Sequence, residues 1–255
     1  MGCDPFKEAQ LMHRFYADGT VTADCRAFLS PEDTVHAIRV LRMRPGDPLE
    51  LMSDGKRYSA VLDSESGSRI SVTVTGEIAS AEPALKITLY QGLPKADKME
   101  WIVQKATEAG ISAIVPVLME RCVSRPDAKD AKKKQERWQK IAREAGKQSG
   151  RSLIPEVASP VRLNDLSDMF CNHDAVIVPW EDQSGYGPKA FAAEHTDIRS
   201  LGIVIGPEGG IDAKEIDLLK KYGCRPVTLG PRILRTETAG LAALCAIMCL
   251  YGEME

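Results

Sequence analysis

The pattern of hydrophobic and polar residues changes at Pro83. Before this proline, short alternating stretches are separated by turn residues, and the Asp54-Gly55 pair is typical of a hairpin turn. We expect a short helix at 31–41 and strands at 48–52, 57–63 and 69–76. These short elements predict a small β-barrel domain over residues 1–82.

After Pro83, longer apolar stretches alternate with amphipathic helical segments. The predicted strands are 85–91, 113–118, 175–180, 201–206 and 226–230. The predicted helices are 97–110, 127–148, 212–222 and 236–251. Because continuous apolar strands that alternate with helices form a parallel sheet covered on both faces, residues 83–255 are expected to form an α/β domain.

Composition excludes several classes of protein. The chain has no run of 18 apolar residues and no basic-then-apolar start, so neither membrane insertion nor secretion is expected. Its seven cysteines are scattered without a C-x-x-C pair, which indicates reduced thiols in the cytoplasm. Cys245 and Cys249 lie in an apolar helix without nearby histidines, so we predict core residues there and no metal site.

Positive charge is concentrated in one element. Residues 121–151 hold 11 basic and 4 acidic side chains, whereas the rest of the chain is net acidic. A localised basic patch is what phosphate binding requires, but a solvated helix face would have the same composition. Charge alone leaves both interpretations open.

Two predicted strands end on Gly-Pro turns, at Gly206-Pro207 and Gly230-Pro231. Ligands of parallel α/β sheets bind at the carboxyl ends of the strands, where glycine lets the backbone approach a ligand and proline fixes the chain direction. Strand termination alone could also explain either turn. Because the sequence lacks dinucleotide-binding, P-loop and G-x-S-x-G motifs, we favour a pocket for group transfer from a cofactor.

The segments around these turns resemble a known family. IGPEGGID at 205–212 and LGPRILRTETAGLAAL at 229–244 resemble the two C-terminal motifs of SPOUT methyltransferases, and match most closely the RsmE family. The resemblance continues through KADKMEWIVQKATEAGI (95–111), ERCVSR (120–125) and RWQKIAREAGKQSGR (137–151), and covers nearly the whole chain. One departure is Gly146-Lys147, where a neutral or acidic pair would be expected.

The resemblance implies a cytoplasmic, homodimeric enzyme that methylates N3 of one uridine in 16S ribosomal RNA, within the small ribosomal subunit. It implies a PUA-like RNA-binding barrel followed by an α/β domain with a C-terminal trefoil knot and an active site at the subunit interface. S-adenosylmethionine would be held in the knot. The residues expected to contact it are Trp180, Ile205, Gly206, Pro207, Glu208, Gly209, Gly210, Leu229, Gly230, Ile233, Leu234, Thr238 and Ala239.

Methylation at N3 requires loss of the N3 proton, and the developing anion spreads over N3, O2 and O4. A guanidinium suits such an anion, so Arg235 or Arg232 is the expected catalytic group, with Glu237 orienting an arginine or accepting the proton. The three side chains could instead form a structural ion-pair network. The cations expected to bind RNA are Arg39, Arg42, Arg44, Lys132, Lys133, Lys134, Arg137, Lys140, Arg143 and Arg151.

Two other functions agree with the same residues. One is a methyltransferase of this architecture that acts on transfer RNA or on 23S ribosomal RNA. The other is an RNA-binding protein without catalytic activity, which the intact GPEGG (206–210) and RTETA (235–239) segments disfavour.

Overall fold

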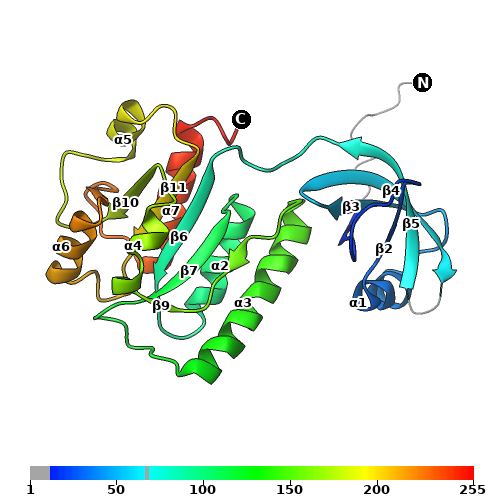
Figure 1. Cartoon of the computed structure of the whole chain (residues 1–255), viewed down its shortest axis with the longest axis horizontal. Helices are drawn as coiled ribbons and strands as arrows, with labels where there is room; N and C mark the ends of the chain where they lie inside the picture. The colour runs from blue at the N-terminus through cyan, green and yellow to red at the C-terminus, as the bar shows by residue number, and fades with distance from the viewer. Residues whose placement is uncertain (1–11, 67–68) are drawn as a thin grey trace. The chain divides into compact units, whose positions relative to one another are not determined.

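The computed structural model describes residues 12–66 and 69–255 and divides the chain into two compact units (Figure 1). The first comprises Met1–Glu82 together with Gly146–Leu153, and the second comprises Pro83–Ala145 and Ile154–Glu255. The sequence division at Pro83 coincides with this boundary. The sequence pattern did not indicate that the later segment Gly146–Leu153 also belongs to the first unit.

The first unit is a mixed β-sheet with strand order β1-β3-β4-β5-β2. Its strands are β1 (His13–Tyr16), β2 (Arg26–Phe28), β3 (Pro48–Ser53), β4 (Lys56–Ser66) and β5 (Arg69–Ile78). β1 is parallel to β3, and the other pairs are antiparallel. A bridge between Ala17 and Leu29 links the two ends of this order, as expected for strands that curl toward a barrel.

One predicted helix of the first unit has two parts. α1 (Pro31–Val35) begins at Ser30, whose hydroxyl caps the Asp33 N–H, and continues into a π-helical turn, η1 (His36–Val40). Arg42 follows at a φ of 57°, which ends the helical segment. The sequence pattern showed the helical period but not the wider turn.

The second unit contains a parallel sheet with the order β12-β10-β11-β6-β7-β8, and β9 also pairs with β7. Its strands are β6 (Lys86–Gly92), β7 (Ala113–Leu118), β8 (Glu156–Val157), β9 (Val161–Arg162), β10 (Ala175–Pro179), β11 (Ser200–Ile205) and β12 (Arg225–Val227). The predicted parallel α/β architecture is confirmed. β12 is shorter than predicted because Thr228 leaves the sheet and donates its N–H to the Tyr186 carbonyl.

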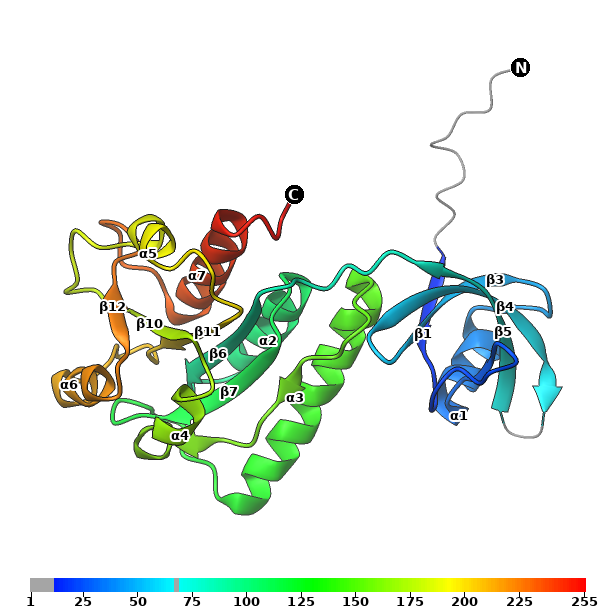
Figure 2. The same ribbon diagram turned by 45° about the horizontal axis from the view of Figure 1, so that its top comes forward.

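Helices cover both faces of this sheet, as Figures 1 and 2 show. They are α2 (Lys98–Glu108), α3 (Ala128–Ser149), η2 (Leu163–Asp165), α4 (Ser167–Phe170), α5 (Pro188–Glu194), α6 (Ala213–Lys221) and α7 (Thr236–Leu250). α7 packs against α2, α5, β11 and β6. Within the described residues, none of these helices is both long enough and apolar enough to span a membrane.

The segment between β12 and α7 crosses the sheet at the carboxyl ends of its strands. β12 lies at the sheet edge beside β10, whereas α7 packs on β11 and β6. Residues 228–235 therefore pass across the ends of β10 and β11. The trefoil knot would form at this crossing, and it stays a prediction.

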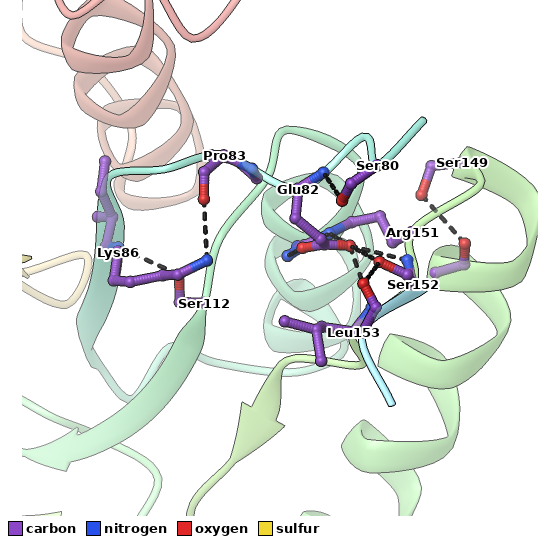
Figure 3. Close-up of polar contacts among 12 residues, drawn as sticks. Ser80, Glu82, Pro83, Lys86, Ser112, Ser149, Arg151, Ser152 and Leu153 are labelled. Atoms are coloured by element: carbon purple, nitrogen blue, oxygen red, sulfur yellow. Dashed lines mark hydrogen bonds and ion pairs between the residues drawn. The ribbon is translucent and has the colours of Figure 1, made fainter. Parts of the chain in front are cut away.

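Residues 146–153 are joined to the first unit by buried polar contacts (Figure 3). The Arg151 guanidinium lies 2.6 Å from the Glu82 carboxylate, which also accepts the N–H groups of Ser152 at 2.8 Å and Leu153 at 3.1 Å. Arg151 was expected to bind RNA. Because this guanidinium is buried and paired, that assignment is corrected.

The Gly146-Lys147 pair, which departs from the family pattern, also contacts other residues of the first unit. A Cβ on Gly146 would lie 2.5 Å from the Tyr16 hydroxyl oxygen, so glycine makes room for this ring against α3. The Tyr16 hydroxyl donates to the Arg151 carbonyl at 2.8 Å. The Lys147 ammonium forms an ion pair of 2.7 Å with Asp33. Both residues of the pair therefore have structural roles.

Candidate functional site: two cavities at the carboxyl ends of the strands

The loops that follow β10, β11 and β12 meet at the carboxyl edge of the sheet and enclose two cavities, each of about 450 Å³. Ligand sites of this size are common at this edge of α/β sheets. The segment 233–239 supplies lining residues to both cavities, although not every residue in it lines one. The side chains that line both are Pro179, Glu181, Ile233, Leu234 and Ala239.

The first cavity is lined mainly by the loops after β10 and β12. Its larger apolar side chains are Pro179, Trp180, Leu229, Pro231, Ile233 and Leu234. Gly185 and Gly230 also line it at φ values of 74° and 98°, with open space where a Cβ would lie. Backbone can therefore approach a ligand at these two positions. Within the described chain, the N–H groups of Leu229, Ile233 and Leu234 donate to no protein acceptor.

The second cavity is more polar and is lined by the loop after β11. It includes the whole segment Gly206–Ile211, together with Lys98, Arg235 and Thr236. Gly92, at the end of β6, fixes one wall because a Cβ there would lie only 2.6 Å from the Pro207 nitrogen. The close packing of β6 on this loop thus requires glycine.

Arg121 holds the other side of the same loop. Its guanidinium donates to the Gly209 carbonyl at 2.9 Å and pairs with Asp212 at 3.2 Å. Asp212 also caps α6 through a capping box with Glu215. The loop after β11 is therefore held by Arg121 and by the start of α6 before any ligand is bound.

Thr236 connects three elements at the base of the second cavity. Its hydroxyl donates to the Gly206 carbonyl at 2.6 Å and accepts from the Gln91 side-chain amide at 2.8 Å. Gln91 is completely buried, and its Oε1 has no hydrogen-bond donor among the described residues. This network fixes the start of α7 against β6 and the loop after β11.

Lys98 pairs with two carboxylates at the start of α2. Its ammonium lies 3.1 Å from Oε1 of Glu208 and 3.3 Å from Oε2 of Glu237. Glu208, followed by Glu237, raises the pKa of Lys98, which therefore stays protonated at neutral pH. Burial raises the pKa of Glu208, but its own N–H, the Lys95 N–H and the Lys98 ammonium outweigh burial and hold that pKa below its ordinary value.

The predicted catalytic residues are not brought together. Arg235 lines the second cavity and Arg232 lines the first. Both arginines are exposed, and within the described chain neither guanidinium has a hydrogen bond or ion pair. Glu237 pairs with Lys98 and lines neither cavity. The suggested Arg232–Arg235–Glu237 ion-pair network and the orientation of an arginine by Glu237 are therefore corrected.

A family model for the RNA methyltransferase domain matches residues 81–248. The ribosomal RNA small subunit methyltransferase E of Bacillus subtilis strain 168 is 40% identical over 227 residues, covering 86% of this chain and 88% of the relative. The chain belongs to this methyltransferase E family. The family member of Aquifex aeolicus strain VF5 is 32% identical over 238 residues, covering 93% of this chain and 99% of the relative.

The family fold is also present in a crystal structure of ribosomal RNA small subunit methyltransferase E from Neisseria gonorrhoeae, bound to S-adenosyl methionine. That structure has a TM-score of 0.80 and 33% identity, and the match covers 94% of this chain and 98% of the other. The mixed β-sheet unit and the parallel sheet with its helices thus correspond to the family architecture.

Most of the residues that the family resemblance assigns to the cofactor line one of the two cavities. The exception is Thr238, which is exposed and lines neither. The residues that contact the loops or cavities and were not predicted include Gln91, Lys98, Arg121 and Glu181. Lys98 lies in the KADKMEW segment and Arg121 lies in the ERCVSR segment, and both segments carried the family resemblance. That resemblance was the sequence feature that could have identified these two residues.

Most of the cations expected to bind RNA are exposed. Arg39, Arg42 and Arg44 belong to the first unit, and Lys132, Lys133, Lys134 and Lys140 project from α3. Arg137 is exposed but forms an ion pair of 2.8 Å with Glu100, and Arg143 is half-buried. The strongest unpaired positive charge on α3 is therefore near its N-terminal end.

Proposed function

We propose that this chain transfers a methyl group from S-adenosylmethionine to N3 of a uridine in 16S ribosomal RNA. The observation that carries the proposal is the pair of cavities formed where residues 233–239 lie between the loops after β10 and β11. Family membership supports the same reaction, since the relatives are named as methyltransferases of small-subunit ribosomal RNA.

The first cavity fits the methyl donor. Trp180, Leu229 and Leu234 supply apolar surface for an adenosine group, and unpaired backbone N–H groups can donate to its polar atoms. The glycines of the loop after β11 would hold the amino-acid portion nearby. When bound, S-adenosylmethionine supplies a methyl carbon attached to a positively charged sulfur, which needs no further activation.

The second cavity would receive the target base. There the N3–CH₃ bond forms as the carbon–sulfur bond breaks and its electrons stay on sulfur, while the N3 proton leaves to solvent. Arg235 lines this cavity without an ion-pair partner in the described chain, so its charge is available to the uracil anion. Arg232 lines the first cavity and would contact the donor instead.

Replacement of Arg235 by alanine tests this assignment. We expect methyl transfer to small ribosomal subunits to fall on the order of 10²-fold, as for loss of one electrostatic contact to a developing anion. The affinity for S-adenosylmethionine, measured by calorimetry, should change little. Unchanged turnover in a folded R235A variant would remove Arg235 from the reaction.

The first unit and α3 are proposed to bind RNA, through the exposed cations of each. We further propose a cytoplasmic homodimer. Ile233, which lines both cavities, is 89% exposed, and a second copy that covered it would also complete the site. Sedimentation of wild-type and I233E proteins would test the dimer, with a monomeric I233E variant as the expected result. Mapping the methylated nucleotide would distinguish 16S from transfer or large-subunit RNA.

A further inference from the structure

Lys98 is the charged residue at the centre of the polar cluster in the second cavity. It lines the cavity together with Glu208, whereas Glu237 lines neither cavity. Oε2 of Glu237 is inaccessible to solvent and has no hydrogen-bond partner among the described residues, although it lies 3.3 Å from the Lys98 ammonium. Lys98 is therefore the member of the Lys98–Glu237 pair that a substrate would meet.

The arrangement gives the two residues different tasks. An ammonium carries three N–H groups, and the ion pairs with Glu208 and Glu237 occupy at most two of them, so at least one is left for a ligand. Glu237 lines neither cavity, so we do not assign it a direct contact with a base in the second cavity. Its negative charge instead fixes the position of Lys98.

We propose that Lys98 is a further catalytic and specificity-determining residue, whose ammonium donates to an exocyclic oxygen, O2 or O4, of the target uracil. The inference rests on the proposed function. Loss of the N3 proton places negative charge on these oxygens, which a fixed cation stabilises more in the transition state than in the ground state. Arg235 lines the same cavity and would supply the second positive charge.

The same contact would contribute to base selection. Uracil presents an acceptor on each side of N3, whereas cytosine presents an amino group in place of O4. A base held with its O4 position toward Lys98 would place this amino group against the ammonium, donor against donor. With O2 toward Lys98, discrimination would come from N3, which in cytosine carries no proton to lose.

Sulfur substitution at the target base tests the contact directly. Small ribosomal subunits are reconstituted with 16S RNA that carries uridine, 2-thiouridine or 4-thiouridine at the methylated position. Single-turnover methyl transfer is then measured for wild type, K98M, K98R and K105M. Lys105 is the matched control because it lies on α2, is 34% exposed against 33% for Lys98, pairs with Glu108, and lines neither cavity.

We expect K98M to reduce the rate on uridine on the order of 10²-fold and K98R to restore part of it. One of the two thio substitutions should change the wild-type and K105M rates by the same factor, and this factor should shrink toward one in K98M. Identical thio effects in wild type and K98M, whatever the absolute rates, would overturn the proposal. So would the absence of any thio effect at both positions in wild type.

A second variant separates positioning from proton transfer. E237Q keeps the shape of the side chain, and we expect it to reduce the rate about tenfold and leave the affinity for S-adenosylmethionine unchanged. Complete loss of transfer in a folded E237Q protein would return the role of proton acceptor to Glu237. If wild type does not methylate the uridine-containing particle, the proposed function itself fails; if it does and only the thio effects disagree, the role of Lys98 alone falls.

Discussion

The guanidinium of Arg151 lies 2.6 Å from the carboxylate of Glu82, and the two side chains are only 5% and 7% exposed. Removal of the Arg151 guanidinium would leave the Glu82 carboxylate buried without a charged partner. We expect R151M to lower the free energy of unfolding of the first unit by about 3–5 kcal/mol. Urea denaturation followed by circular dichroism measures this change.

A matched exposed pair provides the control. Arg225 lies 3.2 Å from Glu194, but these side chains are 54% and 51% exposed, so R225M should cost about 1 kcal/mol or less. Similar losses in R151M and R225M would contradict the idea that residues 146–153 are an integral part of the first unit.

The same pair predicts a dependence of stability on pH. Burial raises the pKa of Glu82, but the Arg151 guanidinium and the N–H groups of Leu153 and Ser152 outweigh burial and hold that pKa below its ordinary value of 4.5. A carboxyl whose pKa is lower in the folded state than in the unfolded state stabilises the folded state fully at a pH above its unfolded pKa. This contribution is lost as the pH falls through the folded pKa. Wild type should therefore lose more unfolding free energy than E82Q between about pH 7 and pH 3. Equal losses in the two proteins would show that other carboxyls dominate.

Gly92 should be essential for the shape of the second cavity. In G92A, the new Cβ would lie 2.6 Å from the Pro207 nitrogen and 2.8 Å from the Gly206 carbonyl carbon, so the backbone of the loop must move. We expect the affinity for S-adenosylmethionine, measured by calorimetry, to fall by about tenfold or more. Gly76, on β5, has no atom within 4 Å of its ideal Cβ position, and G76A should bind the donor like wild type. Wild-type affinity in G92A would show that this wall does not contribute to binding.

The lysines at the N-terminal end of α3 should control the electrostatic part of RNA binding. Each phosphate contact contributes about 0.7–0.9 to the slope of log affinity against log salt concentration. K132A/K133A/K134A should therefore reduce this slope by about 1 to 2. The control is K189A/K214A/K221A, which removes three exposed lysines from or near α5 and α6. An unchanged slope in the α3 variant would assign these lysines to a solvated helix face.

Local sequence patterns predicted the longer elements of the second unit because each of these is specified by its own residues, whereas the short elements β8, β9, η2, α4 and α5 were not predicted. α2 shows this directly, with Met99, Ile102, Val103 and Ala106 on its buried face. Gly110 adopts a φ of 95° just beyond Ala109, which follows the helix, as its predicted role in ending the helix requires. β1 and β2, in contrast, were missed because three or four residues carry too little period to distinguish a strand from a loop.

Most features of the site that could not be predicted depend on contacts between residues far apart in the sequence. Nothing near Glu237 in the sequence indicates that its partner is Lys98, 139 positions earlier, rather than one of the adjacent arginines. Arg151 similarly belonged to a basic segment, and only its distance from Glu82 distinguishes it from the exposed cations. The Gly-Pro turns were informative because they mark the ends of strands, which converge in any parallel sheet.

The crossing of residues 228–235 has a consequence for biosynthesis. Ile233, Leu234 and Ala239, which border both cavities, leave the ribosome after every other residue that lines them except those immediately between. A nascent chain interrupted before Ile233 would contain most of the residues that line the cavities but would lack three of the five side chains that the two cavities share. Premature termination would therefore produce an inert product, and the cell would gain methylating capacity only when translation has passed Ala239.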